Sequence, residues 1–143
     1  MNHSRATHPE PAQTTTTVDS ELPALLRAHT AGGRLADTAA VNLLITHRYW
    51  LTHHTFTGRL IHPVDGHPAR ARIDWPAAIT ALDRGQLAGT GSQAHVLRIA
   101  ASLAVGTPII LRQVLGGLDH RTINAVTAAI TAANGTHPEQ DQP

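Results

Sequence analysis

The sequence predicts an α+β fold that is predominantly α: a single domain of about five to six helices, with one β-hairpin at about residues 55–75 between the second and third helices. Apolar residues recur at spacings of three and four over most of the chain, as they do on one face of a helix. They alternate with polar residues only in FTGRLIH and ARARIDW, which flank the turn residues Asp65-Gly66. A chain of 143 residues is long enough for one core of this kind.

Both ends of the chain are polar. Residues 1–19 contain a threonine run and two prolines, and residues 135–143 read GTHPEQDQP. Segments of this composition bury too little apolar surface to offset the conformational entropy that is lost on folding. We therefore expect disordered tails at residues 1–19 and 135–143, and one folded domain at residues 20–134.

Two helices are predicted before the hairpin. Ser20 is a suitable N-cap for the first helix, and Gly32-Gly33 is a suitable end. Because aromatic residues are few, we expect an aliphatic core anchored by Trp50 and Trp75. The second helix is predicted to be long and amphipathic from the spacing of Leu35, Ala39, Leu43, His47, Trp50, Leu51 and His54.

Capping residues and glycines divide the chain after the hairpin into four further helices. Asp74 is expected to cap the first of them, and Ser92 the second, which is mostly apolar. The segment Gly106-Thr107-Pro108 has the pattern of one helix end followed by the start of the next. Asp119 is expected to cap the last helix, Arg121 to Ala133.

Composition excludes several classes of chemistry. The chain has no cysteine, which excludes disulfides, thiolate nucleophiles and cysteine zinc sites. It has no lysine, which excludes a Schiff-base lysine and the lysine of a phosphate-binding loop. No run approaches the roughly 18 apolar residues of a membrane-spanning helix, and the first residues lack the apolar segment of a secretory signal. We expect a cytoplasmic protein without membrane association.

Charge is unevenly distributed along the chain. Residues 20–134 hold ten arginines and six acidic residues, a net charge of +4, whereas the two ends together carry −3. A mildly basic core is compatible with a nucleic-acid partner or with an acidic protein partner.

Patterns that could indicate a cofactor or a metal lack the required context. The segment Gly89–Ala94 matches the dinucleotide fingerprint G-x-G-x-x-A, but the preceding ALDRGQLA does not read as a strand, so we expect a linker there. His47 and His54 are about 10.5 Å apart along a helix, too far to share a metal on their own. His62 and His67 flank the hairpin turn without a clear set of further ligands. We expect neither a cofactor nor a metal.

No catalytic arrangement is evident in the sequence. None of the serines lies in a nucleophile elbow, and Asp74 and Asp119 are already assigned to helix caps. A metal-dependent or histidine-based enzyme, with His95 or His120 as general base, is the alternative that remains open. We expect a protein without enzymatic activity.

The C-terminal segment has features of a helix-turn-helix. A short helix, a glycine turn and a capped helix would place His120, Arg121 and Asn124 on the exposed first turns of the second helix, where nucleic-acid contacts are usually made. The match requires an altered turn, because aligning Gly117 with the turn glycine puts Arg112 at a position that is normally apolar. The alternative is a pair of packed helices that completes the core.

The predicted hairpin carries a second set of basic residues. With its apolar residues turned inward, Arg59, Arg70 and Arg72 would project outward together and contact phosphates. The alternative is a solvated edge whose charges prevent strand pairing with other molecules.

These observations lead to one functional expectation and one alternative. We expect a non-enzymatic binding protein, with a DNA-binding or regulatory role, that contacts nucleic acid through the hairpin arginines and the C-terminal helix pair. The alternative is a protein-interaction or assembly subunit without nucleic-acid binding. The alanine-rich last helix has few polar side chains to expose, which favours a homodimer or another protein partner.

Part of the sequence resembles a known group of proteins. The segments IDWPAAITALDRG and GSQAHVLRIAASLAVGTPIILRQVLGGLDHRTINAVTAAITAANG are similar to small uncharacterised proteins of high-GC actinobacteria, and the resemblance covers most of residues 41–135. No established activity is associated with those proteins. The resemblance therefore implies a bacterial cytoplasmic protein and assigns no site residue.

Overall fold

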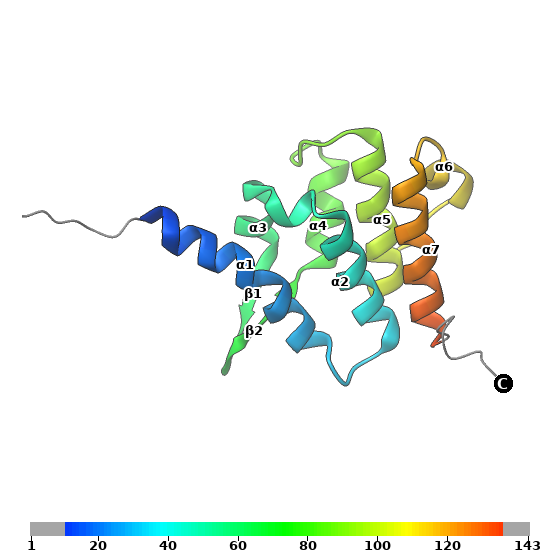
Figure 1. Ribbon diagram of the computed structural model, residues 1–143. Coiled ribbons are helices and arrows are strands. Elements are labelled where there is room, and N and C mark those ends of the chain that lie inside the picture. Colours follow the sequence, from blue (N-terminus) through cyan, green and yellow to red (C-terminus); the bar gives the residue numbers. More distant parts are fainter. Residues whose placement is uncertain (1–10, 136–143) are drawn as a thin grey trace, which may run out of the picture.

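The computed structural model describes residues 11–135, with side chains from residue 21 onward, and shows a mostly helical single domain with one antiparallel hairpin in the middle of the chain (Figure 1). The architecture predicted from the sequence is thereby confirmed. None of the helices within residues 11–135 has an apolar stretch long enough to cross a membrane. In chain order the elements are α1 (Pro11–Thr30), α2 (Leu35–His47), the 3₁₀ turn η1 (Trp50–Thr52), α3 (His54–Leu60), β1 (Ile61–Val64), β2 (His67–Ile73), α4 (Trp75–Asp83), α5 (Gly91–Val105), α6 (Leu111–Leu115) and α7 (His120–Asn134).

Helix α2 is the centre of the packing. It lies against α5 and α7, and α1 packs against both α2 and β2 (Figure 1). The core is aliphatic apart from a small aromatic group around Trp50, whose ring centroid is 5.5 Å from that of Phe56. Trp50 and Trp75 are both buried, as expected from the sequence. The largest fully buried side chains are Trp50, Phe56, Leu26, Leu43, Leu44, Leu97 and Val96.

The long second helix predicted through His54 is wrong, because α2 ends at His47 and the chain turns at Arg48. Arg48 has a positive φ of 75°, and its N–H donates to the carbonyl oxygen of Leu44. The turn has a packing reason. Trp50 and Phe56 are six residues apart, so a continuous helix would place them about 120° apart around its axis and about 9 Å apart along it. Their contact in the core requires the break.

The hairpin is shorter than predicted and starts later. Residues 54–60 form α3, so the strands occupy only residues 61–73. Ile61 pairs with Ile73 and His62 with Arg72, and the register is irregular between Pro63 and Val64. The predicted Asp65-Gly66 turn is confirmed, since these two residues connect the strands and Gly66 has a φ of 78°.

Helix α1 is longer than the predicted first helix. It begins at Pro11, so Ser20 is not its N-cap and residues 11–19 of the expected tail are helical. Once the second half of α1 is docked on the core, each further residue adds a helical hydrogen bond without a new nucleation cost, which is why the helix continues outward. The remaining residues of the two expected tails, 1–10 and 136–143, lie outside the described part of the chain.

Capping residues differ in how well the sequence predicted them. Asp74 and Asp119 cap α4 and α7, where their carboxylates accept the N–H groups of Ala77 and Thr122 at 3.1 and 2.8 Å. The cap of α5 is Thr90 rather than Ser92, because Thr90 forms a reciprocal capping box with Gln93.

The helix start predicted at Thr107 and Pro108 is also wrong. Helix α6 begins at Leu111 instead, with Ile110 preceding it. The end of α5 at Gly106, which has a φ of 75°, is confirmed.

Candidate functional site

The hairpin presents Arg70 and Arg72 on one side. Along β2, Ala71 and Ile73 are 5% and 7% exposed, so the arginines that alternate with them point away from the core. Arg59 does not belong to the hairpin, which corrects the sequence prediction. It lies exposed at the end of α3, one residue before Leu60, so it sits at the base of the two strands rather than along them.

Basic side chains predominate around the hairpin. We call Arg59, His62, His67, Arg70 and Arg72 the hairpin basic surface. Within residues 21–135, none of its arginines forms an ion pair, whereas Arg34 and Arg98 pair with Asp37 and Asp83 at 3.7 and 2.6 Å.

Two carboxylates lie near this surface. Asp65 is in the hairpin turn, and Asp74 at the base already accepts a hydrogen bond as the N-cap of α4. The guanidinium groups of the hairpin basic surface are therefore available to an anion, because neither carboxylate is paired with them.

A pocket of about 250 Å³ adjoins this surface. It lies between α1, the start of α2, β2 and the end of α5, and Arg72 forms part of its wall. His29 and Arg34 also line it, together with Asp37, which is the ion-pair partner of Arg34. The pocket thus continues from Arg72 toward the loop between α1 and α2, where the charge of Arg34 is offset by Asp37.

The three residues predicted on the last helix are exposed on its first turns. His120, Arg121 and Asn124 all face solvent, and the N-cap Asp119 precedes them. The pKa of the Asp119 carboxylate is held below its usual value, chiefly by hydrogen bonds from Thr122 and less by the nearby His47 and Arg121.

The helix pair differs from a helix-turn-helix in its first member. Helix α6 has only five residues, and it buries Val114 while leaving Leu111 57% and Leu115 37% exposed. Helix α7 packs mainly against α2 and to a smaller extent against α5.

The two predicted sets of basic residues lie on different sides of the molecule. The hairpin packs beside α1, whereas α7 lies beyond α2 as seen from the hairpin (Figure 1). Arg70 and Arg72 are therefore not on the surface that carries His120, Arg121 and Asn124. Local sequence pattern could not show that the two sets are on separate surfaces, because their relative position depends on how the helices between them are arranged.

Three histidine rings each have a buried nitrogen that makes no hydrogen bond. These nitrogens are the Nδ1 atoms of His47, His53 and His95, which have no partner within the described residues. The ring of His53 lies against Tyr49 and Trp50. Burial lowers the pKa of His47, and the Asp119 carboxylate opposes this shift. In residues 21–135, no three histidine or carboxylate side chains are grouped so that they could hold a metal ion.

Gly89, the first glycine of the fingerprint-like segment, has a structural role. A Cβ on Gly89 would lie 3.1 Å from the Cη2 atom of Trp50, so this position requires close approach of the backbone to the indole. Thr90 and Gln93 are used by the capping box of α5. The segment follows the loop after α4, not a strand, as expected from the sequence.

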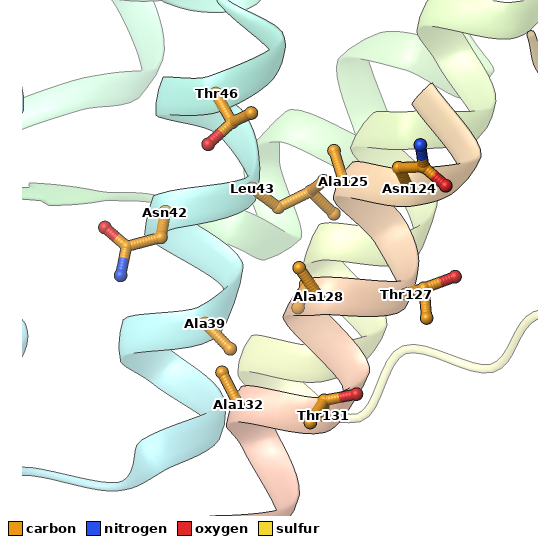
Figure 2. Close-up of a pocket in the computed structure, with 11 residues that line it drawn as sticks. Ala39, Asn42, Leu43, Thr46, Asn124, Ala125, Thr127, Ala128, Thr131 and Ala132 are labelled. Carbon is orange, nitrogen blue, oxygen red and sulfur yellow. The ribbon is translucent and has the colours of Figure 1, made fainter. Parts of the chain in front are cut away.

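A groove of about 600 Å³ lies between α2 and α7, and we call it the α2–α7 groove (Figure 2). Figure 2 shows Leu43 pointing from α2 toward α7, and Ala128 and Ala132 pointing from α7 toward α2. In the sequence, the small side chains that recur at spacings of three and four on the last helix indicated this surface. The groove is lined by Ala39, Asn42, Leu43, Thr46, Asn124, Ala125, Thr127, Ala128, Ala129, Thr131 and Ala132.

Comparisons of the chain with models of protein families, with curated proteins and with solved structures found no match.

Proposed function

We propose that this chain is a non-enzymatic binding protein that contacts the phosphate backbone of nucleic acid through the hairpin basic surface. One observation carries the proposal: Arg70 and Arg72 project from the same face of β2, exposed and without an acidic partner among the described residues. Guanidinium groups bind phosphate oxygens in bidentate fashion, which makes unpaired arginines on a fixed strand suitable for this purpose.

The spacing of the two arginines suits a nucleic-acid strand. Residues two apart on a β-strand are about 6.6–6.8 Å apart. That distance is about the axial rise of two nucleotides of one strand in duplex DNA, at roughly 3.4 Å each. Arg59 at the base of the hairpin extends the surface beyond β2. Such contacts supply affinity without reading the base sequence.

His120, Arg121 and Asn124 form a separate candidate contact in this proposal. They lie on the far side of α2 from the hairpin (Figure 1). A short duplex that lies along the hairpin is therefore not expected to touch them. Replacing Arg121 by Gln tests this separately, since binding that depends on the hairpin alone is unaffected by the change.

Binding of the full chain to a generic DNA duplex, measured as a function of salt, tests the proposal. The logarithm of the binding constant should fall linearly with the logarithm of the salt concentration, because each neutralised phosphate releases counterions. Arg70→Gln combined with Arg72→Gln should make this slope shallower by about 2, one unit for each lost phosphate contact.

Arg84→Gln is the matched control for that experiment. Arg84 is an exposed arginine at the C-cap of α4, outside the hairpin. Like the hairpin arginines, it forms no ion pair within residues 21–135. It should leave the slope unchanged. Absence of binding at low salt, or an equal effect of the control, would contradict the proposal.

A protein-interaction or assembly function is the second candidate, and the α2–α7 groove is the observation that favours it. A groove lined mainly by alanine and threonine side chains is suited to packing against another protein, and it offers no charged group for an anionic ligand. This candidate does not depend on nucleic-acid binding, because the groove and the hairpin are on different parts of the surface.

A further inference from the structure

Helices α2 and α7 run in opposite directions and leave one face of the pair uncovered. The end of α7 lies at the start of α2, where the Cδ1 atom of Leu35 is 3.2 Å from the position that a Cβ of Gly135 would occupy. At the opposite end of the pair, His47 lies close enough to Asp119 for the two charges to interact. The α2–α7 groove occupies the face between these two ends (Figure 2).

The lining of the groove is small and uncharged. Of its eleven residues, five are alanines, three are threonines and two are asparagines, and the remaining one is Leu43. Short side chains leave a hollow along the pair that a protruding apolar side chain from another molecule would fill. The absence of charge means that no ion has to lose its hydration when this face is covered.

A protruding apolar side chain stands at one end of the same face. Leu35 lies four residues before Ala39, on the same side of α2, and is 56% exposed. A two-fold dimer brings the same patch of both molecules together, so each copy has to offer both the protrusion and the hollow. This face has both, since the small residues of the groove can receive the Leu35 side chain of a second copy.

We propose that the α2–α7 groove is a dimer interface and that its occupant is a second copy of this chain. The uncharged lining is what a two-fold interface requires near its axis, where each residue comes close to its own counterpart and like charges would repel. The proposal is independent of nucleic-acid binding through the hairpin, because none of the lining residues belongs to the hairpin basic surface. Asn124 lines the groove, so dimerisation would compete with the separate candidate contact at His120, Arg121 and Asn124.

The size of the face predicts a weak dimer. Helix α7 has 15 residues, which corresponds to a length of about 22 Å, and two packed helices are about 20 Å wide. The footprint is therefore roughly 450 Å² per molecule, below the roughly 800 Å² of a standard stable interface. The monomer already has its own core, so we expect association that depends on concentration and not an obligate dimer.

Sedimentation of the full chain between about 1 µM and about 1 mM tests this, because a small interface of this kind is expected to dissociate within that range. The weight-average mass should rise from that of a monomer to that of a dimer. Ala128→Arg places a charge in the middle of the groove and should weaken dimerisation at least about a hundredfold. Ala24→Arg, on the exposed side of α1, is the matched control and should dimerise like the original protein.

A second measurement keeps the proposal testable if the arginine variant folds poorly. Because the chain has no cysteine, Thr131→Cys provides a single thiol in the groove and Ala24→Cys provides one outside it. Alkylation of the groove thiol should slow as the protein concentration rises, while that of the control thiol stays constant. A chain that remains monomeric at the highest concentration, or a dimer in which the groove thiol stays equally reactive, would overturn the proposal in favour of another occupant or another interface.

Discussion

The indole Nε1 of Trp50 donates a hydrogen bond to the carbonyl oxygen of Gln93, with 2.9 Å between the two atoms. Trp50 is fully buried, and Gln93 also closes the capping box at the start of α5. The bond therefore joins η1 to the first turn of α5, two segments that are 43 residues apart in the sequence. It holds the chain in place just after it has turned away from α2.

Replacing Trp50 by Phe should lower the free energy of unfolding by about 2–4 kcal/mol, since the change leaves a carbonyl unpaired and a cavity in the core. Urea denaturation followed by far-ultraviolet circular dichroism measures the loss. Trp75→Phe is the control, because the Trp75 indole makes no hydrogen bond within the described residues, and it should cost less. Equal losses at the two positions would show that the hydrogen bond to Gln93 contributes nothing.

The capping box of α5 can be tested with two neighbouring hydroxyl residues. Thr90→Ala removes the oxygen that accepts the Gln93 N–H and should cost about 1 kcal/mol of stability. Ser92→Ala removes a hydroxyl that makes no cap and should change stability by less than about 0.5 kcal/mol. The difference between the midpoints of thermal unfolding of the two variants measures the effect. A larger loss for Ser92→Ala would reverse the assignment of the cap.

Arg48 is the one residue other than glycine with a positive φ among residues 11–135. Arg48→Gly should increase the free energy of unfolding by roughly 0.5–2 kcal/mol, because relief of backbone strain outweighs the greater freedom of glycine in the unfolded chain. Arg84→Gly is the matched control, since Arg84 also follows the end of a helix but has a φ of −87°. That variant should be destabilised. Chemical denaturation of both variants provides the comparison, and a loss of stability in Arg48→Gly would contradict the prediction.

His47 should make stability depend on pH. Because burial lowers its pKa in the folded protein, the unfolded chain takes up a proton first as the pH falls. The free energy of unfolding should therefore decrease as the pH falls below about 6.5 and level off once the folded protein is also protonated. The Asp119 carboxylate makes this decrease smaller than burial alone would.

Urea denaturation at pH 8 and at successively lower pH, for the original chain and for His47→Gln, measures this dependence. The variant should lose part of the decrease. His54→Gln, at an exposed position in α3, is the control and should keep it. A decrease of the same size in His47→Gln would assign the pH dependence to other groups.

Much of the fold follows from local sequence. The starts of the helices capped by Asp74 and Asp119, the end of α5 at Gly106 and the turn at Asp65-Gly66 are all determined by residues within a few positions of the element. Capping and turn residues act through hydrogen bonds and backbone angles close to themselves, so the sequence shows them directly. Where two hydroxyl residues compete, as Thr90 and Ser92 do, the three-residue spacing to Gln93 decides, and this spacing was available in the sequence.

The break after α2 and the position of Arg59 could not be predicted from local pattern, because tertiary packing overrides it there. The spacing of apolar residues from Leu35 to His54 is compatible with one helix, and only the packing of Trp50 against Phe56 and α5 requires the break at Arg48. Because residues 54–60 form α3 and not the first part of the expected strand, Arg59 lies at the base of the hairpin and not along it. The outward direction of Arg70 and Arg72 was predictable, because the two-residue period of a strand determines it.

Placing the hairpin and the α2–α7 groove on separate parts of the surface has a consequence for valency. In a pair of molecules joined through the groove, both hairpins stay uncovered, and each pair carries two copies of Arg70 and Arg72. A long polyanion that reaches both would bind more tightly than a short one, by an effective-concentration factor that depends on its length and stiffness. Strengthening the pairing would then raise affinity for long nucleic acids while leaving affinity for short fragments unchanged.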